Sequence, residues 1–293
     1  MTSIRNPANT CPFCASTATS HRYDRGEFQI MACTGCHGGF ASPRSGLAPS
    51  EQIYGPAFVE RYKSGVMQGK ELLRWRFRQF MRHPSLQQPG PRAGSTRRVL
   101  DIGCASGGLL TEFRNAGWEV HGVEISPELA SLSRAQGIPV VAGDVATVDM
   151  PVGSFDLITM SHVIEHLPDP LATLAGCARW LRDAGAVAVE TPNWKGIGAL
   201  VRRAKWSQIT PPLHLNYFGP KAFRRLALRA GFAGSSTATA TPPVLEVLAG
   251  RGAAARLVAR LGYRLAALAG LGTTLFGFAW KQGGLAQPAP GEP

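Results

Sequence analysis

Short apolar runs alternate with amphipathic segments through the central part of the chain. The run 98–103 has the composition of a buried strand, and the glycine-rich residues after it lead into Leu109, Leu110 and Phe113 at helical spacing. A second helix is predicted at 127–136, and further strands are predicted at 119–123, 140–142, 155–160 and 186–189. This alternation predicts an α/β fold with a doubly wound parallel sheet, whose ligand binds at the carboxyl ends of the strands.

The flanking segments have other patterns. Residues 27–31 alternate between apolar and polar side chains, as in a hairpin strand. Residues 245–270 have helical periodicity, with Arg256, Arg260 and Arg264 placed among leucines. Such a helix is either a lid with a solvated face or a peripheral contact with an anionic membrane through 251–264, and we favour the lid.

Charge is distributed unevenly over the 293 residues. The formal net charge is +12, yet residues 99–190 contain 4 basic and 12 acidic side chains. Residues 83–95 are rich in Pro, Gly and Ser and have the composition of a linker. These shifts predict three segments, which are residues 1–45, a basic helical connector at 46–95 and the sheet domain at 96–293, with 194–220 and 244–270 beside its site.

Neither a signal peptide nor a membrane span is predicted. No apolar core follows Met1, and the longest uncharged apolar run, 265–280, is shorter than the roughly 20 residues that span a bilayer. We therefore expect a cytoplasmic protein. In that compartment, paired cysteines hold metal more often than they form disulfides.

Two C-x-x-C pairs lie near the N-terminus. Cys11 and Cys14 form the first pair, and Cys33 and Cys36 form the second, with 18 residues between the pairs. This spacing is typical of four thiolates around one tetrahedral zinc ion. A redox role is the alternative, but a thioredoxin-type motif is a single pair. With all four positions taken by cysteine, the zinc would stabilise the fold and leave no position open for chemistry.

Acidic residues follow three of the predicted strands. Asp101 precedes a turn with the pattern Asp101-x-Gly103-x-Ala105-x-Gly107, Glu124 ends the next strand, and Asp144 ends the third. The glycines allow the backbone to approach a ligand at the positive end of a helix, and an acid such as Glu124 binds a ribose diol. A carboxylate beside the first glycine would repel the pyrophosphate of NAD, so the pattern favours a ligand with an amino group and a sulfonium.

These motifs, together with residues 155–170, resemble those of class I S-adenosylmethionine-dependent methyltransferases, which have a Rossmann-like sheet. The resemblance implies that Asp101, Gly103 and Gly107 surround the methionine part of the cofactor. It implies that Glu124 binds the ribose, and that Asp144 with Val145 contacts the adenine. Ala105 departs from the more common glycine of this family.

The resemblance extends to the N-terminus. Two C-x-x-C pairs followed by Ser42-Pro43-Arg44, Tyr54-Gly55 and a basic helix are similar to zinc-ribbon methyltransferases linked to the synthesis of glycans and natural products. Some members of that group methylate carbon atoms of nucleotide-linked sugars. The resemblance thus implies a small zinc ribbon ahead of the methyltransferase domain.

Histidines in two segments are candidates for acid-base chemistry. Residues 162–166 read H-x-x-E-H, a zinc peptidase pattern that we reject because the predicted turn and short helix end at Pro168. The resemblance implies His166 as general base and Glu165 as its orienting partner, although Val163 replaces the tyrosine that usually accompanies the pair. A structural role for His166 is an equally good interpretation. His214 is the second candidate base.

Three functions are compatible with these features. The first is methyl transfer to a small-molecule or glycan acceptor that is anionic, for example a nucleotide-linked sugar. The second is RNA methylation, in which a basic arm of arginines grips phosphates; these are Arg74, Arg76, Arg78 and Arg82. The third is a binding module without catalysis. The complete set of acids argues against the third function, and the lack of an Asn/Asp-Pro-Pro-aromatic motif argues against the second.

Overall fold

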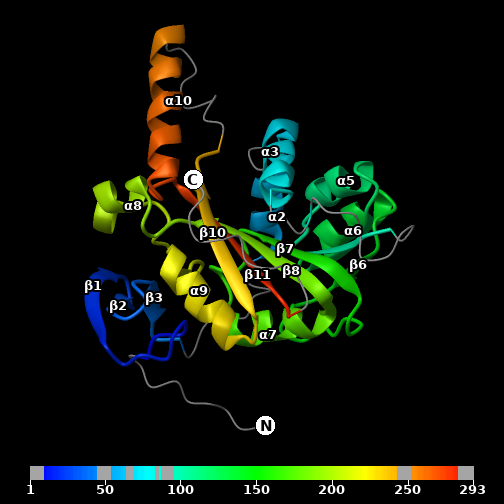
Figure 1. The fold of residues 1–293 in the computed structure, drawn as a ribbon, viewed down its shortest axis with the longest axis horizontal. Coiled ribbons are helices and arrows are strands. Elements are labelled where there is room, and N and C mark those ends of the chain that lie inside the picture. The colour runs from blue at the N-terminus through cyan, green and yellow to red at the C-terminus, as the bar shows by residue number, and fades with distance from the viewer. Residues whose placement is uncertain are drawn as a thin grey trace.

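The computed structural model describes residues 10–44, 54–63, 69–82, 86, 96–242 and 252–282 (Figure 1). Within them, the strands form two sheets. The larger sheet has seven strands in the order β10-β11-β8-β7-β4-β5-β6, and the smaller has four strands in the order β1-β2-β3-β9.

The seven-stranded sheet confirms the predicted α/β fold of the Rossmann-like methyltransferase type. Its five parallel strands are β4 (Arg98–Ile102), β5 (Glu119–Glu124), β6 (Val140–Ala142), β7 (Phe155–Ser161) and β8 (Leu181–Pro192). Two antiparallel strands complete it, β10 (Gly234–Ala240) and β11 (Thr274–Trp280), with β11 between β8 and β10. The observed β8 is longer than the predicted strand at 186–189.

Helices cover both faces of this sheet. On one face, α3 (Lys70–Phe80) and α5 (Gly108–Asn115) pack Trp75 and Phe113 into a core with Phe276 of β11. On the other face lie α7 (Pro170–Trp180) and α9 (Pro220–Arg229). The helix α6 (Pro127–Ala135) begins at a serine cap, because the Ser126 side chain accepts a hydrogen bond from the Leu129 amide and proline occupies the first position of the helix.

The N-terminal residues form a ribbon that is joined to the rest of the chain. Its strands are β1 (Thr19–Arg25), β2 (Phe28–Cys33) and β3 (Gly39–Ser42), and β3 pairs with β9 (Asn216–Tyr217) of the sheet domain. Phe13 of the ribbon contacts Phe218, with ring centroids 4.6 Å apart. The N-terminal ribbon therefore shares a sheet and a hydrophobic core with the sheet domain.

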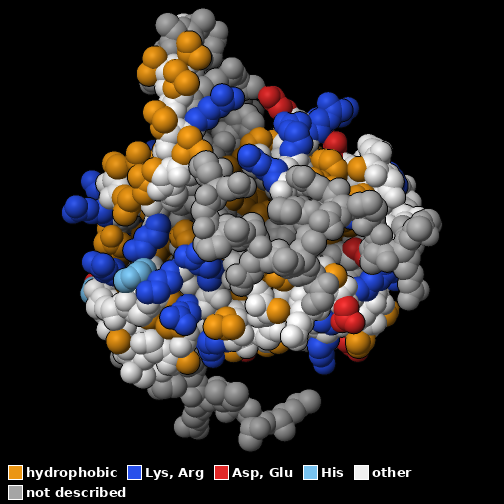
Figure 2. All heavy atoms as spheres, in the orientation of Figure 1, with side chains coloured by type: hydrophobic (Ala, Val, Ile, Leu, Met, Phe, Trp, Pro, Cys, Tyr) orange, Lys and Arg blue, Asp and Glu red, His pale blue; other side chains and the backbone are white. Residues whose placement is uncertain are grey.

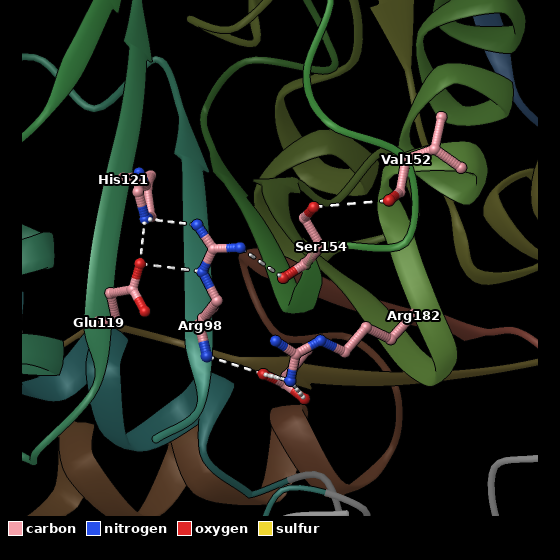
Figure 3. Close-up of polar contacts among 7 residues, drawn as sticks. Arg98, Glu119, His121, Val152, Ser154 and Arg182 are labelled. Atoms are coloured by element: carbon pink, nitrogen blue, oxygen red, sulfur yellow. Dashed lines mark hydrogen bonds and ion pairs between the residues drawn. The ribbon is translucent and has the colours of Figure 1, made fainter. Parts of the chain in front are cut away.

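A polar cluster lies at the amino ends of the parallel strands (Figure 3). The Arg98 guanidinium donates a hydrogen bond to Glu119 over 2.9 Å and lies 3.1 Å from His121, and Arg182 forms an ion pair of 3.0 Å with Asp156. The cluster joins the starts of neighbouring strands, whereas the glycine turn follows the opposite end of β4. Its residues therefore lie far from the candidate site and are suitable controls for substitutions there.

The connector and the helices α8 (Ile197–Arg202) and α10 (Ala253–Leu268) lie at the carboxyl edge of the larger sheet (Figure 1). The connector contains α2 (Pro56–Lys63) and α3, and most of the linker predicted at 83–95 is outside the described residues. The short α8 follows β8, and α10 projects from the body. Among the described residues, no helix has the length and apolar character needed to cross a membrane.

Candidate functional site

The turn between β4 and α5 has the backbone that only glycine accepts easily. Gly103 has a φ of +72° and Gly107 a φ of +82°. A Cβ atom on Gly103 would lie 2.5 Å from the Val163 Cγ2 atom, and one on Gly107 would lie 2.4 Å from the Ser133 hydroxyl. Both glycines are therefore required by local geometry, independently of any ligand.

Glu124 connects this turn to the next strand end. Its Oε2 atom accepts a hydrogen bond from the Ala105 amide over 2.8 Å, and its Oε1 atom accepts one from the Ser126 amide over 2.9 Å. Burial raises the pKa of the Glu124 carboxyl, and the amide hydrogen bonds oppose that change. Each carboxylate oxygen has a second lone pair, so Glu124 can still accept hydrogen bonds from a diol.

Ala105 is the residue at which the turn departs from the family pattern. Its φ is +49°, in the left-handed region that glycine favours. The hydrogen bond from its amide to Glu124 offsets this strain. The structure therefore explains why glycine is the more common residue here and how alanine is accommodated.

A cavity lies beside the glycine turn. Asp101, Gly103 and Ala105 line it from the turn, and Ser161 and His162 line it from the end of β7. The Thr159 hydroxyl donates a hydrogen bond of 2.7 Å to Asp101, while burial raises the pKa of Asp101 to about 7. Two of the three residues predicted to bind the methionine part, Asp101 and Gly103, thus line this cavity, whereas Gly107 does not.

The remaining cofactor residues predicted from the sequence lie on neighbouring strand ends. Asp144 follows β6, and its Oδ1 atom accepts a hydrogen bond of 2.9 Å from the Ala146 amide. Val145 packs against the core beside it. Glu124 and Ala142 are register partners of β5 and β6, so Asp144 comes two residues after a position level with Glu124.

Three residues of the connector complete the wall of the cavity, and sequence reasoning missed their role. They are Tyr62, Leu73 and Arg76. Leu73 approaches the turn so closely that a Cβ on Gly108 would lie 2.7 Å from it. Arg76 is buried, with 8% of the residue exposed, and its Nε atom lies 2.9 Å from the Glu190 carboxylate. Arg76 therefore does not belong to an exposed basic arm that could grip RNA phosphates, as was considered above.

A network of charged side chains forms part of the cavity wall. His162 contacts two carboxylates, with Nδ1 3.0 Å from Glu165 and Nε2 3.5 Å from Glu190. Burial alone would lower the pKa of His162, but the two carboxylates raise it to about 10. Burial tends to raise the pKa of Glu165, and His162 overcomes that effect and holds it at about 2. Two cationic side chains, His162 and Arg76, therefore face two carboxylates.

His166 and His214 lie side by side, with ring centroids 4.7 Å apart. Nδ1 of His166 is 2.8 Å from the Leu213 carbonyl, and Nδ1 of His214 is 2.8 Å from the Gln208 carbonyl. A carbonyl oxygen only accepts hydrogen bonds, so in both neutral rings Nδ1 carries the proton and Nε2 has a free lone pair. In each ring Nε2 is thus the nitrogen at which a proton could be accepted.

The expected pairing of Glu165 with His166 needs correction. Ligand atoms of Glu165, His166 and His214 lie within 4.8 Å of one another, but the hydrogen bonds of the Glu165 carboxylate go to His162 and to Thr191, the latter over 3.0 Å. Main-chain carbonyls, rather than Glu165, orient the two rings. The two oxygens of Glu165 face His162 and Thr191 of β8 rather than His166.

The four N-terminal cysteines converge on one point. Sulfur separations are 3.6 Å for Cys11 and Cys36 and 3.5 Å for Cys14 and Cys33, and all four sulfurs lie within 4.8 Å of one another. Four thiolates at about 2.3 Å around a tetrahedral zinc would be separated by about 3.8 Å. The four side chains therefore fit a zinc ion without rearrangement of the ribbon.

A sheet of this order, with a glycine turn after β4 and acids at the ends of β5 and β6, defines the class I methyltransferase fold. The chain belongs to the family described as "Methyltransferase domain", whose sequence pattern matches residues 68–237. This match confirms the methyltransferase resemblance inferred from the motifs.

Similar proteins agree with this assignment. The ubiquinone biosynthesis O-methyltransferase of Xanthomonas oryzae pv. oryzae is 35% identical over 103 residues, which cover 33% of this chain and 43% of that protein. The matched region thus spans less than half the length of this curated relative. An S-adenosylmethionine-dependent methyltransferase of Archaeoglobus fulgidus has the same fold at 20% identity and a TM-score of 0.55, covering 78% of this chain and all of that one. The magnesium protoporphyrin IX methyltransferase of Synechocystis, solved with bound S-adenosylhomocysteine, has a TM-score of 0.53 at 12% identity, covering 80% and 98% of the two chains.

Proposed function

We propose that this protein transfers a methyl group from S-adenosylmethionine to a hydroxyl group of a small-molecule acceptor. The observation that carries the proposal is the pair His166 and His214, whose Nδ1 atoms are held by main-chain carbonyls. His166 comes four residues after His162, which lines the cavity at the glycine turn. The name of the Xanthomonas relatives, ubiquinone biosynthesis O-methyltransferase, supports oxygen as the methylated atom.

The cofactor would occupy the cavity at the glycine turn. Asp101, Gly103 and Gly107 would surround its methionine part and Glu124 its ribose, while Asp144 and Val145 would contact the adenine. The connector residues Tyr62, Leu73 and Arg76, which line the cavity, would cover it. A sulfonium beside the Asp101 carboxylate is electrostatically favourable, whereas a pyrophosphate there is not.

In the proposed reaction, the acceptor oxygen attacks the methyl carbon as the carbon–sulfur bond breaks, and S-adenosylhomocysteine leaves. Nε2 of His166 would take the hydroxyl proton, so the positive charge lost by the sulfonium would appear on the imidazole ring. The pKa of His214 is lowered to about 4, mainly by burial, which makes His214 a weak base at neutral pH. The main task of the site is in-line placement of the two reactants with water excluded.

We propose further that zinc binds Cys11, Cys14, Cys33 and Cys36 as a structural ion.

We also propose that the acceptor is anionic, for instance a nucleotide-linked sugar. Half-buried Lys195 follows β8 on the expected acceptor side and would attract a negative group. With an anionic acceptor, the kcat/KM of the enzyme should fall steeply as the salt concentration rises. Lys195→Ala should weaken that dependence on salt. The cytoplasmic location expected from the sequence stays a prediction.

Calorimetry with S-adenosylmethionine, S-adenosylhomocysteine and NAD tests the proposal. We expect the first two to bind and NAD not to bind. Glu124→Ala should weaken S-adenosylmethionine binding by about 1.5 to 3 kcal/mol, the range for hydrogen bonds to a charged group. Glu119→Ala is the matched control, because Glu119 lies at the other end of the same strand and contacts Arg98 and His121 (Figure 3). Tight binding of NAD, or equal losses in the two variants, would contradict the assignment.

A further inference from the structure

Large apolar side chains are exposed mainly on two helices. Of twelve exposed large hydrophobic residues among those that the structure describes, eight lie on α8 and α10. They are Ile197, Leu200 and Val201 on α8, and Leu257, Val258, Leu261, Leu265 and Leu268 on α10. Their exposed fractions run from 40% to 86%, so these side chains are solvated in the isolated chain.

The two helices form one continuous surface. The Ile197 amide at the start of α8 donates a hydrogen bond of 2.9 Å to the carbonyl of Leu271, just after α10. The Asn193 side chain donates one of 2.8 Å to the Gly272 carbonyl. Figure 2 shows the apolar side chains along α10 and over the adjoining α8. We call these eight residues the α8–α10 surface. Apolar patches of this kind on a soluble domain mark interaction sites.

The surroundings of the α8–α10 surface are positively charged. From residue 191 to residue 291 the sequence contains 13 Lys and Arg and a single acid, Glu246. Arg202, Arg203 and Lys205 are exposed directly after α8, and Arg264 is exposed on α10. Exposed leucines flanked by basic residues are the pattern of helices that lie on an anionic lipid surface.

We propose that the α8–α10 surface docks the protein on an anionic phospholipid bilayer. Leucines on α10 and aliphatic side chains on α8 would enter the interface between headgroups and acyl chains, while the adjoining arginines and lysine contact lipid phosphates. A second copy of the chain fits this surface poorly, because a symmetric contact would bring the basic residues of both copies together.

The position of the surface gives the docking a direction. The helix α8 begins after the carboxyl end of β8, and β8 runs parallel to β7 and β4, which lead to the cavity. The α8–α10 surface therefore lies on the same edge of the sheet as the glycine turn (Figure 1). Docking would place this edge next to the lipid headgroups, with the amino-edge cluster around Arg98 facing away.

Vesicle sedimentation of the full chain tests the proposal. The probes are vesicles of phosphatidylcholine alone and of phosphatidylcholine with phosphatidylglycerol in equal amounts. We expect the protein to sediment with the second kind and to dissociate as salt is raised, because the attraction of basic residues to the surface is screened. An absence of sedimentation with either kind would overturn the proposal.

Two matched pairs of variants locate the surface. The double variant Leu261→Asp with Leu265→Asp should lower vesicle affinity at least about tenfold, whereas Leu228→Asp, at a leucine 62% exposed on α9, should not. Replacing Arg202, Arg203 and Lys205 by Ala should also lower affinity at least about tenfold. Replacing Lys221, Arg224 and Arg225 of α9 by Ala removes the same charge and should have a smaller effect.

Folding and self-association are checked in the same samples. Thermal unfolding and S-adenosylhomocysteine binding should be unchanged in the variants, because every substituted side chain is exposed. Equal losses in both charge variants would show attraction of the whole basic chain rather than docking through α8 and α10. A dimer in sedimentation equilibrium that Leu261→Asp with Leu265→Asp converts to a monomer would assign the surface to a second copy instead.

Discussion

Arg76 of α3 lies with its Nε atom 2.9 Å from the Oε2 atom of Glu190 in β8, and both side chains are buried. Glu190 also accepts a hydrogen bond of 2.6 Å from the Ser161 hydroxyl and faces His162. Burial would raise the pKa of Glu190, but the cationic His162 and Arg76 lower it. This ion pair fixes the connector helix to the sheet beside the cavity.

Arg76→Ala should therefore destabilise the protein by about 3 to 5 kcal/mol, because a buried carboxylate loses one of its two cations. S-adenosylmethionine binding should weaken as well, since Arg76 lines the cavity. Urea unfolding and calorimetry measure the two effects. Arg74→Ala is the control: Arg74 is on the same helix, is 63% exposed and lies 3.7 Å from Glu112, so its loss should cost less than about 1 kcal/mol. Equal stabilities of the two variants would contradict a structural role for the ion pair.

His166→Ala should lower turnover by roughly 100- to 10,000-fold, the usual contribution of a general base. Its affinity for S-adenosylmethionine should remain close to that of the wild type, because His166 is not among the residues that line the cavity. Steady-state kinetics and calorimetry provide the two measurements.

His214→Ala is the companion experiment. With a pKa of about 4, His214 is a poor proton acceptor, so its replacement should reduce turnover less than that of His166 and should act mainly through the ring contact of 4.7 Å. Full activity of His166→Ala would remove that residue from the mechanism and transfer the role of base to His214 or to the acceptor. Loss of cofactor binding or of folding would show that His166 is structural.

The ion pair between His162, whose side chain is 28% exposed, and buried Glu165 predicts how stability depends on pH. The pKa of His162 is raised from 6.5 to about 10, so the protonated ring stabilises the folded state fully below about pH 6.5. That contribution should be lost progressively as the pH rises to about 10. The pKa of Glu165 is lowered from 4.5 to about 2, so its contribution is present above pH 4.5 and is lost as the pH falls towards 2.

Urea unfolding of the wild type and of His162→Asn at several pH values measures this. The difference in free energy of unfolding should be constant between pH 5 and 6.5 and should shrink between pH 6.5 and 10. His121→Asn serves as the control, because His121 contacts Glu119 near solvent at the opposite edge (Figure 3). A difference that does not change with pH would mean that His162 is not charged in the folded protein.

Removal of the expected zinc should affect the acceptor side before the cofactor side. The ribbon strand β3 pairs with β9, and the Asn216 side chain of β9 donates hydrogen bonds to the carbonyls of Ile164 and Leu167, which flank Glu165 and His166. The strands β4 and β5 pair only with strands of the larger sheet. Chelation should therefore abolish turnover while binding of S-adenosylhomocysteine persists.

Elemental analysis, activity and calorimetry on the same chelated sample test this prediction. One zinc per chain is expected before chelation and none afterwards. Cys14→Ser should reproduce the effect of chelation, whereas Cys177→Ser changes a buried cysteine of α7 outside the cluster and should keep the metal. Full turnover without the metal would show that the ribbon and the turn at 164–167 are independent.

The elements of the fold that follow from local pattern were predictable. The apolar run of β4 and the glycines after it predicted the turn, and the structure shows the physical requirement in the positive φ angles of Gly103 and Gly107. The four cysteines were likewise predictable, because two turns of fixed spacing suffice to bring four sulfurs together.

Contacts between distant segments could not be predicted in this way. Arg76 stands in a basic stretch that favours a solvated face, and its partner Glu190 is far away in the sequence, within an apolar strand. The association of β3 with β9 has no signal either, because β9 is two residues long. The partners of Glu165 depended on the position of His162, which has a φ of +55° and turns its ring between two carboxylates.

The position of β11 has a consequence for synthesis of the protein. This strand lies between β8 and β10, although β10 precedes it in the sequence. On the ribosome, β8 and β10 are both complete before β11 emerges, and neither has its β11 partner until then. Until then, the edges of β8 and β10 that pair with β11 remain open to pairing with other chains. The sheet is complete only once residues 274–280 have been added.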